Sequence, residues 1–179
     1  MGFAYLILLP LLSAFSFIGV SQGQLSVGFY ANTSPDAESI VSTVVRNAAQ
    51  SSSKIPPVLL RLHSHGCIWY EFQGCDGSIL IENGPNAERH AFSHQGVGVY
   101  DVIEQAKAQL EASCPGVVSC ADIVALAARD AIVLANGPLY DVPTGRRDGR
   151  VSDVSLAVNI PDVSDSIQQL KAKFLQKGL

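Results

Sequence analysis

Apolar side chains recur three and four residues apart along most of the chain, a spacing typical of helices that bury one face. A first helix is expected after Ser34, which would cap it, with Pro35 in its first turn. Pro56 and Pro57 open a second helix that reaches to about Cys67. The apolar face expected for the first helix consists of Ala37, Ile40, Val41, Val44, Val45 and Ala48.

The second half of the pattern is also helical. A polar, glycine-rich loop over residues 73–98 precedes a third helix over residues 99–112, with Val102, Ile103, Ala106 and Leu110 on its inner face. Residues 120–135 are apolar on nearly all sides, so we expect this helix to lie at the centre of the domain. Residues 139–150 are predicted to be irregular or a short strand pair, and a last helix ends at Gly178.

The ends of the central helix are marked by local signals. Ser119 and Asp122 have the spacing of a capping box at its start, and Gly137 with Pro138 stops it. No internal repeat or linker interrupts the helical pattern. The sequence pattern therefore predicts one mostly α-helical domain.

The first 23 residues have the pattern of a secretory signal peptide. No charged side chain precedes Asp36, and Ser21 and Gly23 supply small residues before a cleavage site at Gln24. The alternative is a membrane anchor, which Pro10 disfavours. We expect a secreted protein with one domain over residues 24–179 and, once the leader is removed, no membrane partner.

Composition excludes some partners. Charged residues make up 16% of the chain, the net charge is −4, and no basic run appears, so nucleic acid is not expected as a partner. Hydrophobic residues make up 47%, enough for a packed core. A monomer is expected. Cysteines of a secreted protein tend to pair, and the 4 cysteines here allow three connectivities that the sequence leaves open.

The densest cluster of reactive side chains lies between Arg61 and Ser78. Residues four apart share a helix face, so Arg61 pairs with His65, and His63 pairs with Cys67. A zinc site would use His63, Cys67 and Cys75, but it would lack a fourth ligand and place a guanidinium near a dication. An arginine beside a histidine suits acid–base chemistry better, because histidine exchanges protons near neutral pH while arginine stabilises negative charge.

Several segments of the chain resemble the secreted plant (class III) haem peroxidases. They occur in the family's order and run from the region after residue 23 to the end: QLSVGFY, AESIV, LLRLHSHGC, GCDGSIL, CPGVVSCADIVALAARD, VPTGRRDGR and QLKAKFLQKGL. The resemblance implies an all-α fold that holds haem between a distal and a proximal half. It implies an enzyme that reduces hydrogen peroxide while oxidising small phenolic donors, with roles in peroxide removal, oxidative stress and the cell wall.

The same resemblance implies roles for single residues. Arg61 matches the distal arginine that stabilises O–O cleavage, and His65 matches the distal histidine that accepts the first peroxide proton. His63 matches a non-catalytic packing residue. Pro161 matches a proline at the edge where aromatic donors bind. The residues that match the calcium site and its water-linked acid are Gly74, Asp76, Ser78 and Glu88.

The chain also departs from the family pattern. Gly66 stands where the family has a calcium-ligating aspartate, so Ca²⁺ should bind weakly or not at all. Cys67 and Cys75, which match a family disulfide, are eight positions apart instead of five. Ser34 replaces the family partner of Cys114, and Cys120 also lacks its usual partner. His94 falls near the family asparagine that accepts a hydrogen bond from the distal histidine, and a neutral His94 could do the same.

The last departure concerns the proximal half. The sequence reaches Leu179 before the family segment that carries the axial histidine ligand of the haem iron. We therefore expect only the distal half, with weak haem binding and low or no activity. The alternative function is a non-catalytic secreted fragment of the family.

Overall fold

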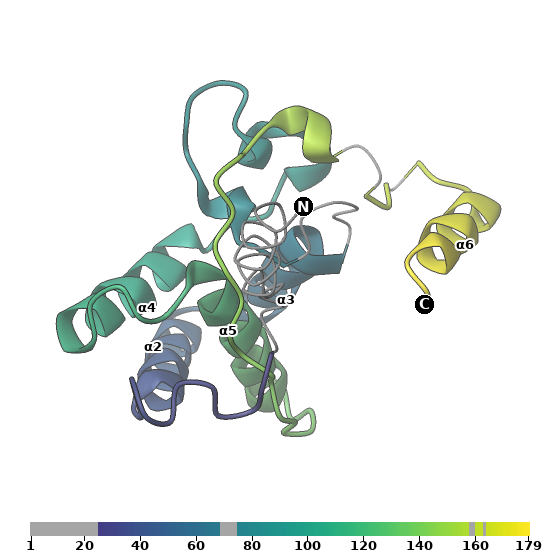
Figure 1. Cartoon of the computed structure of the whole chain (residues 1–179). Helices are drawn as coiled ribbons and strands as arrows, with labels where there is room; N and C mark the ends of the chain where they lie inside the picture. The colour runs from purple at the N-terminus through teal and green to yellow at the C-terminus, as the bar shows by residue number, and fades with distance from the viewer. Residues whose placement is uncertain (1–24, 69–74, 158–159, 163) are drawn as a thin grey trace, which may run out of the picture.

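The computed structural model describes residues 25–68, 75–157, 160–162 and 164–179, coloured along the chain in Figure 1. The helices are α2 (Ala37–Ser51), α3 (Ile55–His63), α4 (Tyr100–Ser113), α5 (Cys120–Leu134) and α6 (Ile167–Gln176). Within this part of the chain, strand pairing is confined to one antiparallel bridge between Ser26 and Thr144. The prediction of an all-α domain is confirmed. The expected leader over residues 1–23 lies outside the described residues, and no described helix is long and apolar enough to cross a membrane.

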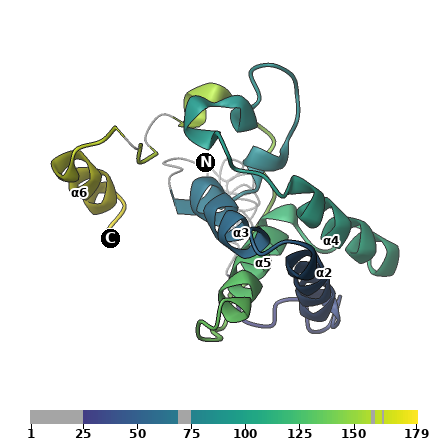
Figure 2. The ribbon, with the colours of Figure 1, turned by 180° about the vertical axis from the view of Figure 1, so that it is seen from behind.

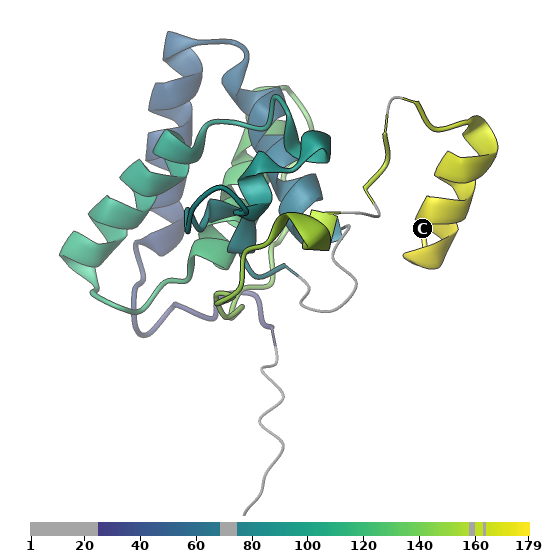
Figure 3. The ribbon, with the colours of Figure 1, turned by 90° about the horizontal axis from the view of Figure 1, so that it is seen from above.

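Helix α5 forms the centre of the helical body. The helices α2, α3 and α4 all pack against it, as Figures 1 and 2 show. Every residue of α5 between Ala121 and Ala131 is buried. A helix without a polar face is stable in water only when neighbours surround it, so the prediction of a central position is confirmed. By contrast, α6 lies apart from this body in Figure 3 and has no buried residue.

The loop between α3 and α4 is built from short turns. A π-helical turn (Ser64–Ile68) continues α3, and 3₁₀ turns follow at Ser78–Leu80, Glu88–His90 and Phe92–His94. A further 3₁₀ turn, Val154–Ala157, packs on the turn at Glu88–His90. The second helix was expected to stay α-helical to Cys67, and that prediction is wrong because the backbone widens into the π turn after His63.

The start of α2 also differs from the prediction. The helix begins at Ala37 after Asp36, and the Ser34 side chain does not cap it. Ser34 is buried instead, with its Oγ 2.6 Å from the Sγ of Cys114 at the end of α4. The helix face is as expected: Ala37, Val41, Val44 and Val45 are buried, and Ile40 and Ala48 pack partly buried against the same core.

The capping box predicted for α5 is half formed. The Ser119 Oγ accepts a hydrogen bond from the Asp122 backbone N–H at 3.1 Å. The Asp122 carboxylate accepts bonds from other parts of the chain: from Tyr30 Oη at 2.6 Å, Gly145 N at 2.7 Å and Arg146 Nη1 at 2.9 Å. Burial and the bond to Asp122 raise the pKa of Tyr30 to about 12. Asp122 thus fastens the N-terminal segment and the segment after α5 to the central helix.

The contact between Ser34 and Cys114 gives a first prediction. Replacing Ser34 with cysteine should form a disulfide with Cys114, because the two side-chain atoms already touch. Closing a loop between residues 80 positions apart should stabilise the fold by roughly 2–4 kcal/mol. Urea unfolding of Ser34→Cys and of the parent chain, both without reductant so that the Cys67–Cys75 disulfide stays intact, measures this gain. The exposed Ser39→Cys on α2 is the control and should show no gain. Three free thiols in Ser34→Cys, instead of Cys120 alone, would contradict the prediction.

Candidate active site

Arg61 and His65 lie together where α3 passes into the π turn. The Arg61 Nε donates a hydrogen bond to the His65 Nε2 at 3.4 Å. Arg61 is exposed, whereas only 8% of the His65 surface is accessible. The structure therefore brings together the two residues that the helical spacing had paired. It places a permanent cation at the surface directly beside a shielded imidazole.

Gly96 makes room for the Arg61 guanidinium. Its φ of +78° is a conformation that side chains disfavour, and a Cβ there would lie 3.1 Å from Arg61 Nη1. A side chain at this position would therefore strain the backbone and push the guanidinium aside by a few tenths of an ångström. The sequence contains Gly96 in a predicted loop, but local patterns do not indicate that this glycine lies against Arg61.

The surroundings of His65 keep its imidazole neutral. Burial, followed by the nearby charges of His94 and Arg61, lowers the pKa of His65 to about 4. Because Nε2 accepts the bond from Arg61, the ring proton belongs on Nδ1. At neutral pH His65 therefore offers an unprotonated Nε2 next to Arg61, which is the form that a general base requires.

His94 packs against His65 from the loop before α4. The two rings meet edge to face, with their centroids 5.2 Å apart. The His94 Nδ1 donates to the backbone carbonyl of Glu88 at 3.0 Å, which leaves its Nε2 as an acceptor. Among the described residues, His65 Nδ1 and His94 Nε2 are both buried without a hydrogen-bond partner. One is a donor and the other an acceptor, so the two nitrogens are complementary.

This complementarity predicts the effect of changing His94. In His94→Leu the hydrogen bond from His94 Nδ1 to the Glu88 carbonyl would be lost, which should cost about 0.5–1.5 kcal/mol of unfolding free energy. The population of the Nδ1–H tautomer of His65, measured from imidazole nitrogen NMR spectra, should also fall. His94→Asn keeps an acceptor and should preserve both properties. Equal tautomer populations in the leucine and asparagine variants would show that His94 does not orient His65.

Three residues expected at a calcium site lie together behind the π turn. Ser78 Oγ donates to Glu88 Oε2 at 2.8 Å, and Ser78 N donates to Asp76 Oδ1 at 3.0 Å. All three side chains are buried, and Asp76 Oδ2 has no hydrogen-bond partner among the described residues. Two carboxylates and a hydroxyl are oxygen donors of the kind Ca²⁺ uses. At Gly66 an added Cβ would lie 3.3 Å from Ile79, and Gly74 lies outside the described residues.

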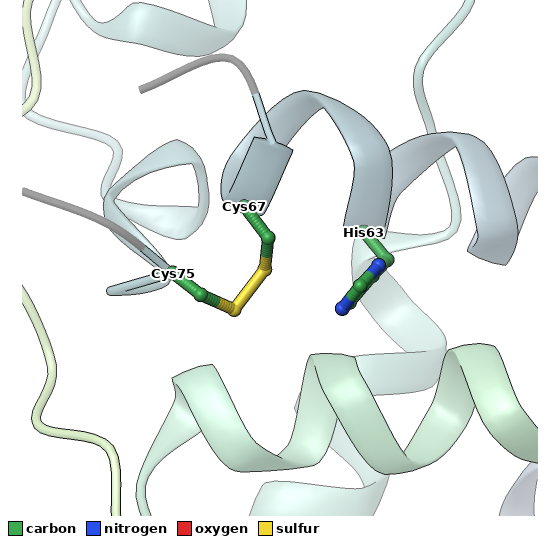
Figure 4. A group of neighbouring side chains, drawn as sticks. All are labelled: His63, Cys67 and Cys75. Atoms are coloured by element: carbon green, nitrogen blue, oxygen red, sulfur yellow. A yellow bond between two sulfur atoms is a disulfide. The ribbon is translucent and has the colours of Figure 1, made fainter. Parts of the chain in front are cut away.

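Cys67 and Cys75 form a disulfide, as the resemblance implied. His63 points toward it from α3, as Figure 4 shows, and burial and the charge of Arg146 lower the pKa of His63. Cys114 and Cys120 are free thiols, and burial followed by the charge of Asp148 raises the pKa of Cys120 to about 11.

Pro161 lies in the segment between the turn Val154–Ala157 and α6. It is half-buried and follows Ile160, which belongs to a small apolar cluster with Ala91 and Ala157. This cluster sits beside the loop that carries His94, because Ser93 donates a hydrogen bond to the carbonyl of Ala157 at 3.1 Å. The segment with Pro161 is therefore fastened to the loop that carries His94.

Comparison with known proteins shows the family to which the chain belongs. The chain is 63% identical to peroxidase 43 of Arabidopsis thaliana over 163 residues, which are 91% of this chain and 49% of that protein. It is 55% identical to peroxidase N1 of Nicotiana tabacum over 86% of this chain and 45% of that protein. The chain thus spans about half the length of these curated relatives. The sequence model of the peroxidase family matches residues 41–179, so the chain belongs to the peroxidase family and corresponds to the distal half of the plant class III peroxidases.

Proposed function

We propose that this chain supplies the distal half of a haem peroxidase that reduces hydrogen peroxide while oxidising phenolic donors. The observation that carries the proposal is the pairing of Arg61 Nε with the unprotonated Nε2 of His65. A neutral imidazole can accept a proton from peroxide, and a neighbouring guanidinium can stabilise the negative charge that develops on oxygen. Residues with these two properties stand side by side at the end of α3.

His65 would act twice in the reaction. Its Nε2 would first accept a proton from hydrogen peroxide and then return this proton to the departing water. Arg61 would donate hydrogen bonds to the oxygen that gains charge, and it would keep its own proton throughout. Haem, when bound, supplies the iron at which the O–O bond is cleaved.

The described residues fit the distal side of a haem group. Arg61 is exposed and His65 lies beneath it, so together they would line that side. The remaining histidines have other contacts: His63 faces the disulfide, His90 pairs with Glu82 at 3.1 Å, and His94 bonds to Glu88. We therefore assign no axial iron ligand among them.

Roles for the calcium-site residues and Pro161, and the location of the protein, follow from the same proposal. Asp76, Ser78 and Glu88 with Gly74 would hold a weakly bound Ca²⁺ that braces the loop behind His65. Pro161 would border the access of phenolic donors. The protein would be a monomer secreted to the cell wall or extracellular space, where it would remove peroxide during oxidative stress and oxidise wall phenolics.

Haem titration followed by donor turnover tests the proposal. The purified chain is titrated with haemin, bound haem is quantified as pyridine haemochrome, and guaiacol oxidation is measured with hydrogen peroxide. Haem binding together with turnover that His65→Leu abolishes supports the proposal, even where both are weak, as expected for a distal half without an assigned axial ligand. Haem binding without turnover, or no haem binding, would overturn it and support a non-catalytic secreted fragment.

A further inference from the structure

We propose that His63, Cys67 and Cys75 form a redox-gated site for one thiophilic divalent metal ion such as Zn²⁺. The site is closed while the disulfide is intact and opens when the disulfide is reduced. It goes beyond the peroxidase reaction, because it uses a different face of α3 from Arg61 and His65. Metal binding would then depend on whether the Cys67–Cys75 pair is oxidised or reduced.

The three potential ligand atoms already lie close together. One imidazole nitrogen and the two sulfur atoms are all within 4.8 Å of one another, and all three residues are half-buried. Figure 4 shows the His63 ring directed at the two sulfurs from the last turn of α3. Atoms bound to one tetrahedral zinc ion lie roughly 3.5–3.8 Å apart, given Zn–S and Zn–N bonds of about 2.3 and 2.0–2.1 Å. Small movements of the released thiolates would therefore complete the arrangement.

The chemical types of the donors favour a soft or borderline ion. Two thiolates and one imidazole are typical zinc ligands, and three protein ligands leave a fourth position for water. Burial and Arg146 lower the pKa of His63, so its imidazole is neutral and available as a ligand. The oxygen-rich cluster of Asp76 and Ser78, by contrast, suits a hard cation.

The neighbouring positive charges do not oppose the ion once the disulfide is reduced. Two thiolates neutralise a divalent cation, so the loaded site carries no net charge. Arg146 lies near His63, but its charge is compensated by Asp122, whose Oδ1 accepts a hydrogen bond from Arg146 Nη1 at 2.9 Å. Arg61 is directed to His65. A nearby guanidinium would repel a divalent ion only if the two thiolates did not balance the charge of that ion.

Opening and loading the site are two balanced steps. A dithiol reductant gives two electrons and two protons to the disulfide, which yields two cysteine thiols and the oxidised cyclic disulfide of the reductant. A divalent ion then displaces both thiol protons and binds two thiolates and the neutral nitrogen of His63, so two protons are released for each ion bound.

Cobalt(II) is a suitable probe, because tetrahedral thiolate coordination gives it intense visible and near-ultraviolet absorption. The chain carries Cys114→Ser and Cys120→Ser, so that only Cys67 and Cys75 supply sulfur. It is reduced with a phosphine, freed of reductant without oxygen, and titrated with Co²⁺ and then Zn²⁺. We expect one equivalent of tetrahedral cobalt in the reduced chain, its displacement by Zn²⁺, and no such spectrum in the oxidised chain.

Two variants separate a built site from adventitious binding to thiols. His63→Ala keeps both thiols and should weaken cobalt binding by at least the roughly 10–100-fold that loss of an outer-shell partner costs. His90→Ala removes an exposed histidine that pairs with Glu82 and should leave binding unchanged. Circular dichroism checks that each variant is folded, and zinc protection of Cys67 and Cys75 against alkylation gives a second readout. Equal binding by His63→Ala and the parent chain, or an octahedral spectrum in both redox states, would overturn the proposal.

Discussion

Replacing His65 with leucine should slow the reaction of the haem-loaded chain with hydrogen peroxide by about 10²–10⁴-fold, the usual loss when a general acid–base is removed. The imidazole is the only described group that accepts a bond from Arg61 Nε, and it is neutral where the reaction runs. Leucine has a similar volume but cannot accept a proton. The measurement is the initial rate of guaiacol oxidation at limiting peroxide, compared between variants with equal haem content.

The pH profile gives this prediction a second readout. Because the pKa of His65 is lowered to about 4, the base is free above that pH and becomes protonated as the pH falls through it. The parent rate should therefore decline as the pH drops through about 4, and His65→Leu should show no such decline. His90→Leu, at an exposed position beside Glu82, should keep both the rate and the pH profile. If His65→Leu retained the parent rate, His65 would have no part in the mechanism.

The low pKa of His65 also makes the free energy of unfolding depend on pH. An unfolded histidine binds a proton near pH 6.5, whereas folded His65 resists protonation until about pH 4. The unfolded chain thus binds more protons between these values, and the stability contributed by His65 falls as the pH is lowered through this window. His63 and His94 are shifted in the same direction, mainly by burial.

Periodicity was sufficient to locate the helical core. The inner face of α4 was predicted at Val102, Ile103, Ala106 and Leu110, and these four are its buried residues. The central place of α5 followed from its lack of a polar face. The pairing of Arg61 with His65 followed from spacing alone, because residues four apart meet even where α3 widens into a π turn.

Contacts between distant segments could not be deduced from local patterns. Ser34 looked like a helix cap, but its position is set by Cys114 at the end of α4. The orientation of His94 depends on the Glu88 carbonyl in an irregular loop, which has no periodicity to read. Asp122 was read as a local capping residue, although a buried acid on an otherwise apolar helix was a signal for partners elsewhere.

Replacing Asp122 with alanine should lower the free energy of unfolding by about 3–5 kcal/mol, the cost of breaking a buried ion pair by removing one partner. Its side chain is completely buried and pairs with Arg146, while also accepting from Tyr30 and Gly145. Without the carboxylate these donors would face a cavity. Urea unfolding measures the loss.

The control for this change is Asp101→Ala, an exposed acid in the first turn of α4, which should change stability by no more than about 0.5 kcal/mol. Tyr30→Phe gives a further test, because it removes only the hydroxyl that donates to Asp122. If the network acts as a unit, Tyr30→Phe should cost stability in the parent chain and much less in Asp122→Ala. Additive losses would show that Tyr30 and Asp122 act independently. A stability of Asp122→Ala equal to that of Asp101→Ala would show that Asp122 does not hold the N-terminal and 145–146 segments on α5.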